Sequence, residues 1–234
     1  MESPEAARAI DAAISIAVAL DLPADGAAVL QNSNKLALRL LPCDVFARVA
    51  VAGREHAAFE VELAQRLAEA ESPVAALEPL VEPRGHERDG FEVTLWTYYE
   101  PVIAEISPAA YAEAVERLHA GMRRLEVPAP HFTDRVAEAQ RIVSSREDSP
   151  ALLDDDRRML ASTLRRLRRA IRDHGAAEQL LHGEPHPGNV LSTANGPLFV
   201  DLETCCHGPV EFDLAHIPES VSEHYPGIDQ ALLR

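Results

Sequence analysis

The spacing of apolar residues over the first hundred positions predicts one helix, a set of antiparallel strands and a second helix between the strands. Residues 4–20 are rich in alanine and predict a helix. Residues 28–40 form two short apolar runs around a polar turn, which favours a hairpin, and residues 45–51 form a third β-rich run. Residues 54–70 change to helical spacing, and residues 91–99 predict a further strand.

Beyond residue 100 the pattern is mainly helical. Ser107 followed by Pro108 is typical of a helix start, and apolar residues at helical spacing follow as far as Leu125. Ser149 and Pro150 repeat this signal. We expect the helix that follows to bury one face and to end at Gly175; that face consists of Leu153, Leu160, Leu164, Leu167 and Ile171.

A polar loop and a hairpin complete the pattern. The loop covers residues 182–189, and the turn at Asn195-Gly196 lies between two apolar runs, which is a strong hairpin signal. The chain is therefore predicted to be α+β. Residues 1–100 form a small lobe with an antiparallel sheet, and residues 101–234 form a mainly helical lobe.

Charge and composition narrow the possible functions. The 234 residues carry 22 basic and 38 acidic side chains, a formal net charge of −16, and Lys35 is the only lysine. A nucleic-acid-binding surface needs clustered basic residues, so this acidity disfavours one. No apolar run is long enough to span a membrane, no signal peptide is evident, and three cysteines imply no disulfide framework. We therefore expect a cytoplasmic protein.

Chemically capable side chains concentrate in two stretches that the hairpin brings side by side. Residues 182–189 contain Glu184 and Asn189, and residues 200–203 contain Asp201 and Glu203. Carboxylate and amide oxygens are hard donors that suit Mg²⁺, an ion that is usually shared with substrate phosphates. A further carboxylate can accept the proton of a substrate hydroxyl. These groups suit phosphoryl transfer, in which positioning and charge neutralisation carry most of the catalysis.

A zinc site is the competing interpretation of the same loop. His182 and Glu184 form an H-x-E sequence, which also opens the signature of zinc deaminases. That signature needs a downstream P-C-x-x-C. Because Cys205 and Cys206 are adjacent, they lack the required spacing, and we disfavour zinc.

The spacing of the loop matches that of kinase catalytic loops. There a histidine precedes the base by two residues, and a metal-binding asparagine follows the base by five; His182, Glu184 and Asn189 keep this order. The segments HGEPHPGNVL, VDLE and GPVEFDLA resemble HGDxHxxN, IDxE/D and GDPxxDLA of the aminoglycoside phosphotransferase and choline kinase-like family. This family is the small-molecule branch of the protein kinase-like fold. The resemblance is strong over residues 181–216.

The resemblance implies a role for each polar residue of the second lobe. Glu184 is the expected catalytic base, and Asn189 and Asp201 are the expected Mg²⁺ ligands. Glu203 is expected to hold a second metal or its waters. Asp213 corresponds to a structural residue that anchors the catalytic loop. Fewer residues follow Asp213 than is usual in the family, so the second lobe is expected to be shortened at its end.

The resemblance also implies a nucleotide site in the first lobe. Residues 29–40 resemble the first two strands and the loop that covers the phosphates. Arg48 stands where the family has a lysine that binds the ATP phosphates, and Glu60 resembles the ion-pair partner of that lysine. Trp96 and Tyr98 lie in the expected hinge beside the adenine, although both residue types are also common in cores.

The implied function is transfer of the γ-phosphate of ATP, or of GTP, to a hydroxyl of a small molecule, with Mg²⁺ as cofactor. The acidity of the chain favours a cationic acceptor such as an aminoglycoside. No nucleic acid or membrane partner is expected, and the oligomeric state is open. Lys35 is an alternative to Arg48 for neutralising the phosphates.

Two other functions remain open at this stage. Glu184 replaces the usual aspartate, the phosphate loop has no glycine, and Arg48 replaces the usual lysine, as expected for a pseudokinase that binds nucleotide without turnover. Nucleotidyl transfer on the same fold is the third alternative.

Overall fold

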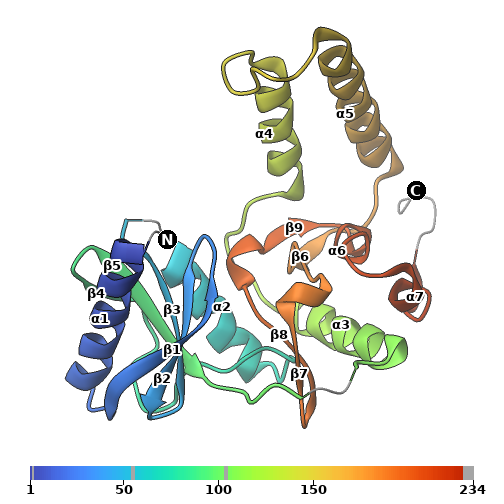
Figure 1. The fold of residues 1–234 in the computed structure, drawn as a ribbon. Helices are drawn as coiled ribbons and strands as arrows, with labels where there is room; N and C mark the ends of the chain where they lie inside the picture. Colours follow the sequence, from blue (N-terminus) through green and yellow to red (C-terminus); the bar gives the residue numbers. More distant parts are fainter. Residues whose placement is uncertain (2, 54–55, 103–104, 229–234) are drawn as a thin grey trace.

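The computed structural model describes residues 1, 3–53, 56–102 and 105–228 (Figure 1). Its N-terminal part contains two helices and a five-stranded antiparallel sheet with strand order β1-β2-β3-β5-β4. The elements of this part are α1 (Ser3–Ala19), β1 (Ala24–Asn32), β2 (Leu36–Pro42), β3 (Val45–Val51), α2 (His56–Glu69), β4 (His86–Arg88) and β5 (Phe91–Thr97). The predicted first helix, hairpin and strands are thus confirmed. Of the second predicted helix, residues 54–55 lie outside the described residues.

The rest of the chain is mainly helical, with two small strand pairs, β6 with β9 and β7 with β8. The long helices are α3 (Pro108–Met122), α4 (Phe132–Ser144) and α5 (Asp154–His174). The remaining elements are β6 (Gln179–Leu181), the 3-10 turn η1 (Pro187–Asn189), β7 (Val190–Thr193), β8 (Gly196–Phe199), the 3-10 turn η2 (Leu202–Thr204), β9 (Cys206–Gly208), α6 (Val210–Leu214) and α7 (Glu219–Ser222). No helix in the described part of the chain is long and apolar enough to cross a membrane.

Alternation along β3 gives the sheet two different faces. Val45, Ala47 and Val49 are buried, whereas Phe46 and Arg48 are only partly buried. Successive side chains of a strand point to opposite faces, so Phe46 and Arg48 share one face. The first face packs on α1, and the second faces α2 and the helical part (Figure 1).

Two large hydrophobic cores dominate the described part of the chain, beside a small third cluster around Phe132, and α2 belongs to the second large core. The sheet core lies between α1 and the first face of the sheet and includes Ile16, Leu38 and Phe91. The helical core includes Leu63 and Leu67 of α2, together with residues of α3, β8 and η2. From the five-stranded sheet, Trp96 is the one buried member of the helical core among the described residues.

Backbone pairing also joins the segment after α2 to the helical part. The Ala75 N–H donates to the Phe199 carbonyl at 2.9 Å, and the Phe199 N–H donates to the Pro73 carbonyl at 2.8 Å. Because Phe199 ends β8, this pairing fixes the position of the chain that leads from β8 into residues 200–203. The boundary between lobes at residue 100 stays a prediction.

Three features of the helices differ from the prediction. Residues 132–144 form α4, which the spacing did not predict, and α5 begins at Asp154 instead of Ser149, which lies in the loop before it. The apolar face of α5 is not buried: no residue of that helix is buried, and Leu153 is 70% exposed. The reason is visible in Figure 1, where α4 and α5 form a hairpin that projects from the rest of the molecule.

Candidate active site

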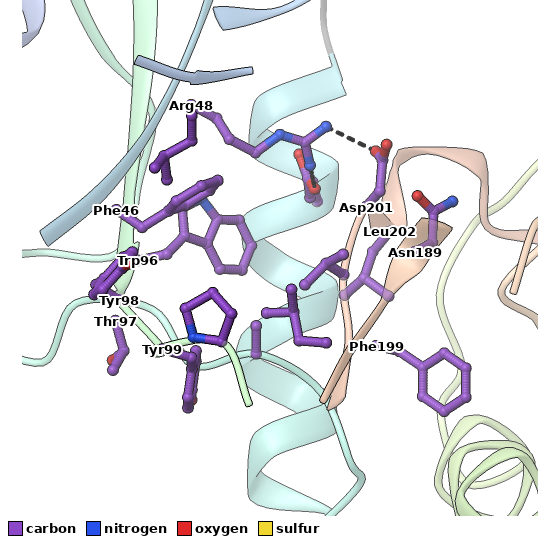
Figure 2. Close-up of a pocket in the computed structure, with 16 residues that line it drawn as sticks. Phe46, Arg48, Trp96, Thr97, Tyr98, Tyr99, Asn189, Phe199, Asp201 and Leu202 are labelled. Carbon is purple, nitrogen blue, oxygen red and sulfur yellow. Dashed lines mark hydrogen bonds and ion pairs between the residues drawn. The ribbon is translucent and has the colours of Figure 1, made fainter. Parts of the chain in front are cut away.

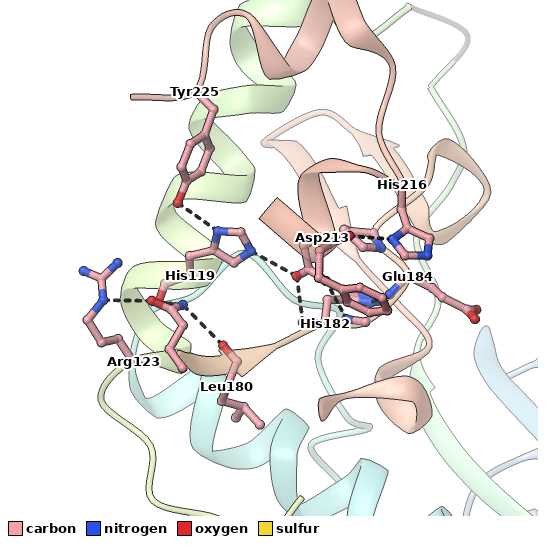
Figure 3. A network of polar contacts seen from close by, with 12 residues as sticks. His119, Arg123, Leu180, His182, Glu184, Asp213, His216 and Tyr225 are labelled. Carbon is pink, nitrogen blue, oxygen red and sulfur yellow. Dashed lines mark hydrogen bonds and ion pairs between the residues drawn. The ribbon is translucent and has the colours of Figure 1, made fainter. Parts of the chain in front are cut away.

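The loop of residues 182–189 is held by a carboxylate from α6. Asp213 is fully buried and accepts hydrogen bonds from the backbone N–H groups of His182 at 2.9 Å and Gly183 at 2.7 Å (Figure 3). His119 of α3 lies 3.0 Å from the same carboxylate, and its other ring nitrogen lies 2.9 Å from the Tyr225 hydroxyl. The loop is therefore fixed to a buried polar network that extends to α3.

The charge of Asp213 suits this anchoring. Burial acts to raise the pKa of Asp213, but the hydrogen bond and charge of His119 and the bond from the Gly183 N–H outweigh it, so the pKa lies below its ordinary value. An ionised carboxylate makes stronger hydrogen bonds to backbone N–H groups than a neutral one. The backbone at His182 and Gly183 is thus oriented by an ionised group.

Gly183 and His182 set the path of the loop. Gly183 has a φ of +88°, and a Cβ at this position would lie 2.1 Å from the carbonyl oxygen of Thr204, so only glycine fits. His182 is buried, and burial lowers its pKa. Its Nε2 donates to the Val200 carbonyl at 3.0 Å, and its Nδ1 accepts a long bond of 3.4 Å from the Glu184 N–H. A neutral ring fits both contacts.

Glu184 points away from this network, as Figure 3 shows. Its side chain is 37% exposed, and its Oε1 accepts a hydrogen bond of 2.8 Å from Arg135 of α4. Arg135 was missed in the sequence, because its helix was not predicted.

Asn189 and Asp201 meet where the two polar stretches converge. The Asn189 side chain donates from Nδ2 to the Glu184 carbonyl at 3.0 Å, an arrangement that leaves its Oδ1 as an acceptor. The Val200 N–H donates to the Asn189 carbonyl at 3.0 Å, which places Asp201 next to the loop. Asp201 has a φ of +67°, in the left-handed region that few non-glycine residues adopt.

Both acidic residues of the second stretch are paired with cations of the sheet. Asp201 accepts a hydrogen bond of 2.8 Å from Nη2 of Arg48 (Figure 2). Glu203 is bonded to Lys35, in the hairpin turn directly before β2, and Lys35 also lies 3.7 Å from Glu60. The predicted Arg48–Glu60 ion pair is present through Nη1 of Arg48.

The Arg48–Glu60 pair is largely shielded from water. The Glu60 side chain is 2% exposed and that of Arg48 is 15% exposed. Burial raises the pKa of Glu60, against the charges of Arg48 and Lys35. Burial also acts to lower the pKa of Arg48, but Glu60 and Asp201 outweigh it and raise the pKa. The guanidinium therefore remains a fixed positive charge beside Asp201.

A cavity of about 400 Å³ opens beside these charges (Figure 2). Apolar and aromatic side chains form most of its wall, and Arg48, Glu60, Asn189 and Asp201 form its polar end. The wall residues are Leu30, Phe46, Ala75, Trp96, Thr97, Tyr98, Tyr99, Pro101, Leu191, Phe199, Val200 and Leu202. Pockets of this kind, mostly apolar with a few polar groups, are typical of cofactor sites.

The structure places the predicted nucleotide residues in this one cavity. Trp96 and Tyr98 both line it, and the Trp96 indole donates to Thr94 at 2.8 Å. The guanidinium of Arg39 lies over the Tyr98 ring at 4.2 Å from its centroid. Phe46 was missed, although the alternation along residues 45–51 puts it on the same face as Arg48.

Glu184 and Glu203 do not line this cavity. Glu203 borders a neighbouring hollow of about 340 Å³ between the sheet and α4, together with Lys35, Arg135 and Thr204. The two carboxylates thus lie outside the apolar cavity, on the side where Asn189 and Asp201 stand.

The donor set fits Mg²⁺ better than a metal held by protein side chains alone. Within the described ranges, no three His, Cys, Asp or Glu side chains form a group that could hold a metal ion. Mg²⁺ is typically bound by one or two carboxylates, with waters and substrate phosphates completing its shell. Asn189, Asp201 and Glu203 offer such an incomplete set.

The comparisons with known proteins agree with this geometry. The family model of the phosphotransferase enzyme family, APH, matches residues 32–233. The search of curated proteins found no match. Several solved structures share the fold at low sequence identity.

Three of these structures illustrate the likeness. The amicoumacin kinase hAmiN, in complex with AMP-PNP, Ca²⁺ and Ami, has a TM-score of 0.70 at 12% identity, with 92% of this chain and 71% of that chain covered. An aminoglycoside-3′-phosphotransferase of type VIII has a TM-score of 0.63 at 20% identity, covering 96% and 95%. A choline/ethanolamine kinase family protein from Mesorhizobium loti has a TM-score of 0.61 at 19% identity, covering 100% and 75%.

These findings confirm three predictions: the protein kinase-like fold, the resemblance to aminoglycoside phosphotransferases and choline kinases, and the activity class of a small-molecule kinase. The match to the family model spans most of the chain, from the β1–β2 hairpin to the C-terminal residues. The chain therefore belongs to the phosphotransferase enzyme family.

Proposed function

We propose that this phosphotransferase moves the γ-phosphate of ATP, or of GTP, to a hydroxyl of a small molecule in the cytoplasm, with Mg²⁺ as cofactor. The observation that carries the proposal is the contact of 2.8 Å between Arg48 and Asp201 at the polar end of the apolar cavity. This contact places the positive charge of Arg48 next to the Asp201 carboxylate, a group that can bind Mg²⁺. Both lie where we expect the phosphates of a nucleotide bound in the cavity.

The cavity divides the nucleotide between two environments. The base is proposed to lie against the aromatic side chains of Phe46 and Trp96, which are neighbours across β3 and β5 and supply a large apolar contact area. The phosphates then reach the end where Arg48 stands, and Lys35 approaches from the β1–β2 hairpin. Both cations lie near this end, and we propose that together they neutralise the phosphate charge that a single lysine neutralises in the related family.

Asn189 and Asp201 are the residues that would hold the metal, and Glu203 lies close enough in sequence to bind a second ion or its waters. When bound, Mg²⁺ neutralises charge on the phosphate oxygens and orients them. The protein's own task is then to hold the side-chain oxygens of Asn189 and Asp201 in place. Asn189 does so through its bond to the Glu184 carbonyl, and Asp201 does so through Arg48.

Glu184 is the proposed base. The acceptor hydroxyl gives its proton to the Glu184 carboxylate while its oxygen bonds to the γ-phosphorus. The bond from that phosphorus to the β–γ bridging oxygen breaks, and a nucleoside diphosphate leaves with that electron pair. The proton is later released to water, which returns Glu184 to its starting form.

The acceptor is proposed to be a cationic small molecule. The net charge of −16 attracts cations over a long range. Two of the similar solved structures are an amicoumacin kinase and an aminoglycoside-3′-phosphotransferase.

The test is phosphate transfer by the purified chain with ATP or GTP, Mg²⁺ and a panel of amines that carry hydroxyls. We expect a phosphate adduct by mass spectrometry and its loss in Glu184→Gln. A nucleotidyl adduct would support the alternative transferase activity. Nucleotide binding without any product would support the pseudokinase and overturn the proposal.

The Glu184→Asp variant separates an adapted base from a degraded one. The contact with Arg135 indicates an adapted glutamate, because the shorter aspartate does not reach the same position. We therefore expect Glu184→Asp to lose activity. A large gain in activity would indicate that the glutamate is a degraded base.

A further inference from the structure

Arg135 connects the projecting hairpin to the proposed base. It lies in the first turn of α4, which is fixed by a capping box between His131 and Asp134. Its Nη1 donates to Oε1 of Glu184 at 2.8 Å, and its Nη2 donates to the Thr204 carbonyl at 3.2 Å. One guanidinium thus contacts the loop of residues 182–189 and the residue that directly follows the stretch 200–203.

The second contact gives the guanidinium a rigid support. Thr204 ends η2, directly after Glu203, and its hydroxyl donates to the His182 carbonyl at 3.0 Å. The same Thr204 carbonyl leaves no room for a side chain at position 183. Arg135 therefore rests on the segment that also shapes the backbone leading to Glu184.

The contact with Glu184 uses one carboxylate oxygen only. Among the described residues, Oε2 of Glu184 has no hydrogen-bond partner, so it is open to an acceptor hydroxyl. The side chains of Arg135 and Glu184 are 40% and 37% exposed. Ion pairs of such exposure contribute little to stability, so the main effect of this pair is on the direction of the carboxylate.

The length of the glutamate gives this contact its purpose. A glutamate has one more rotatable bond than an aspartate, so its carboxylate needs an additional restraint to stay in one place. The planar fork of an arginine supplies such a restraint, since it holds two acceptors at once in fixed geometry. Arg135 therefore compensates for the additional flexibility of Glu184.

We propose that Arg135 is a positioning residue: it fixes the carboxylate of Glu184 through Oε1 so that Oε2 faces the acceptor hydroxyl. This inference rests on the proposed function, since it assumes that Glu184 is the base. It also makes the α4–α5 hairpin part of the machinery that orients the base.

The test is a double-mutant cycle between Arg135→Ala and Glu184→Asp, with steady-state kinetics for each enzyme. In the Glu184 background we expect Arg135→Ala to lower kcat roughly tenfold to a hundredfold, the range for a small misplacement of a catalytic group. The KM for nucleotide is expected to stay within about twofold, because Arg135 does not line the nucleotide cavity. In the Glu184→Asp background the same substitution is expected to have little further effect.

Two further variants guard against a general structural effect. Arg135→Lys keeps a charge that reaches Glu184 and should restore part of kcat. Arg141→Ala is the matched control, because Arg141 lies on the same helix and pairs with Glu138 and Asp148 away from the loop. It is expected to keep full activity.

The outcomes separate the inference from the proposed function. An equal loss of kcat in both backgrounds would assign Arg135 a merely structural role and overturn the inference, as would an unchanged kcat in Arg135→Ala. If Glu184→Asp alone abolishes turnover, the single variants decide. A low kcat in Arg135→Ala, a higher kcat in Arg135→Lys and an unchanged kcat in Arg141→Ala would support the inference, and any other pattern would overturn it. A wild-type chain without any transfer overturns the proposed function, and the inference with it.

Discussion

The guanidinium of Arg48 donates to the carboxylate of Asp201 at 2.8 Å, although the two residues are separated by 153 positions in the chain. The same guanidinium binds Glu60 through its other terminal nitrogen. A planar fork can bridge two carboxylates in this way, whereas the point charge of a lysine ammonium cannot hold both with the same geometry.

We expect Arg48→Met to weaken nucleotide binding at least tenfold, because it removes the fixed charge at the phosphate end of the cavity. It also leaves the buried Glu60 with Lys35 as its remaining partner, so a loss of about 2–4 kcal/mol in unfolding free energy is expected. Isothermal titration with ATP and urea unfolding measure the two effects. Arg66→Met is the control, since Arg66 pairs with Glu62 on the exposed side of α2. Unchanged ATP affinity in Arg48→Met would contradict this prediction.

The anchor of the catalytic loop gives a second prediction. Asp213→Asn keeps the shape of the side chain but removes its charge and turns one acceptor into a donor, which then faces a backbone N–H. We expect a loss of roughly 2–4 kcal/mol in unfolding free energy, together with a marked loss of kcat. Thermal unfolding and kinetics check both. Asp173→Asn on exposed α5 should change neither, and a fully active Asp213→Asn would show that the loop does not need this anchor.

Gly183 allows a test of the loop by steric means alone. Gly183→Ala combines an unfavourable φ with a Cβ only 2.1 Å from the Thr204 carbonyl oxygen, so the loop must shift. We expect a destabilisation of about 2–4 kcal/mol by urea unfolding and a loss of activity. Gly175→Ala is the matched control, because Gly175 has a φ of +66° with open space around it, and should cost only about 1 kcal/mol. Equal effects of the two substitutions would refute the steric argument.

Burial of His182 predicts a pH dependence of stability. Its folded-state pKa lies below the ordinary 6.5, so below about pH 6.5 the unfolded chain binds a proton at this position that the folded chain does not. Stability from this group is therefore complete above pH 6.5 and decreases as the pH falls toward the folded-state pKa. Urea unfolding at several pH values should show a weaker decrease on acidification in His182→Gln than in the wild type. Exposed His224→Gln serves as the control, and the same acid dependence in all three proteins would exclude His182 as the source.

Local patterns predicted much of this fold. Alternation along residues 45–51 and the helical spacing at residues 108–122 each depend on neighbours in sequence, and both elements lie where expected. The loop motifs brought Asn189 and Asp201 together because a short hairpin is all that separates them. The family model supports the fold and the class of enzyme.

The contacts that complete the site could not be predicted in this way. Lys35 meets Glu203, and Arg135 meets Glu184, only after the sheet, the hairpin and the loop have packed together. No spacing rule encodes such distant pairs. Helix α4 was missed because it begins at a histidine cap and lacks the Ser-Pro start signal. The face of α5 was misjudged because helical spacing does not reveal what covers it.

The assignment of α2 to the helical core has a mechanical consequence. Leu63 and Leu67 pack α2 against α3, whereas the sheet packs on α1. The sheet above the cavity and the helix that carries Glu60 therefore belong to different hydrophobic cores. Arg48 extends from β3 of the sheet, and its ion pair with Glu60 of α2 connects the two cores. If the sheet tilts toward a bound nucleotide, the Arg48–Glu60 ion pair is the first contact to be strained. The geometry of this pair then reports how far the sheet has moved relative to α2.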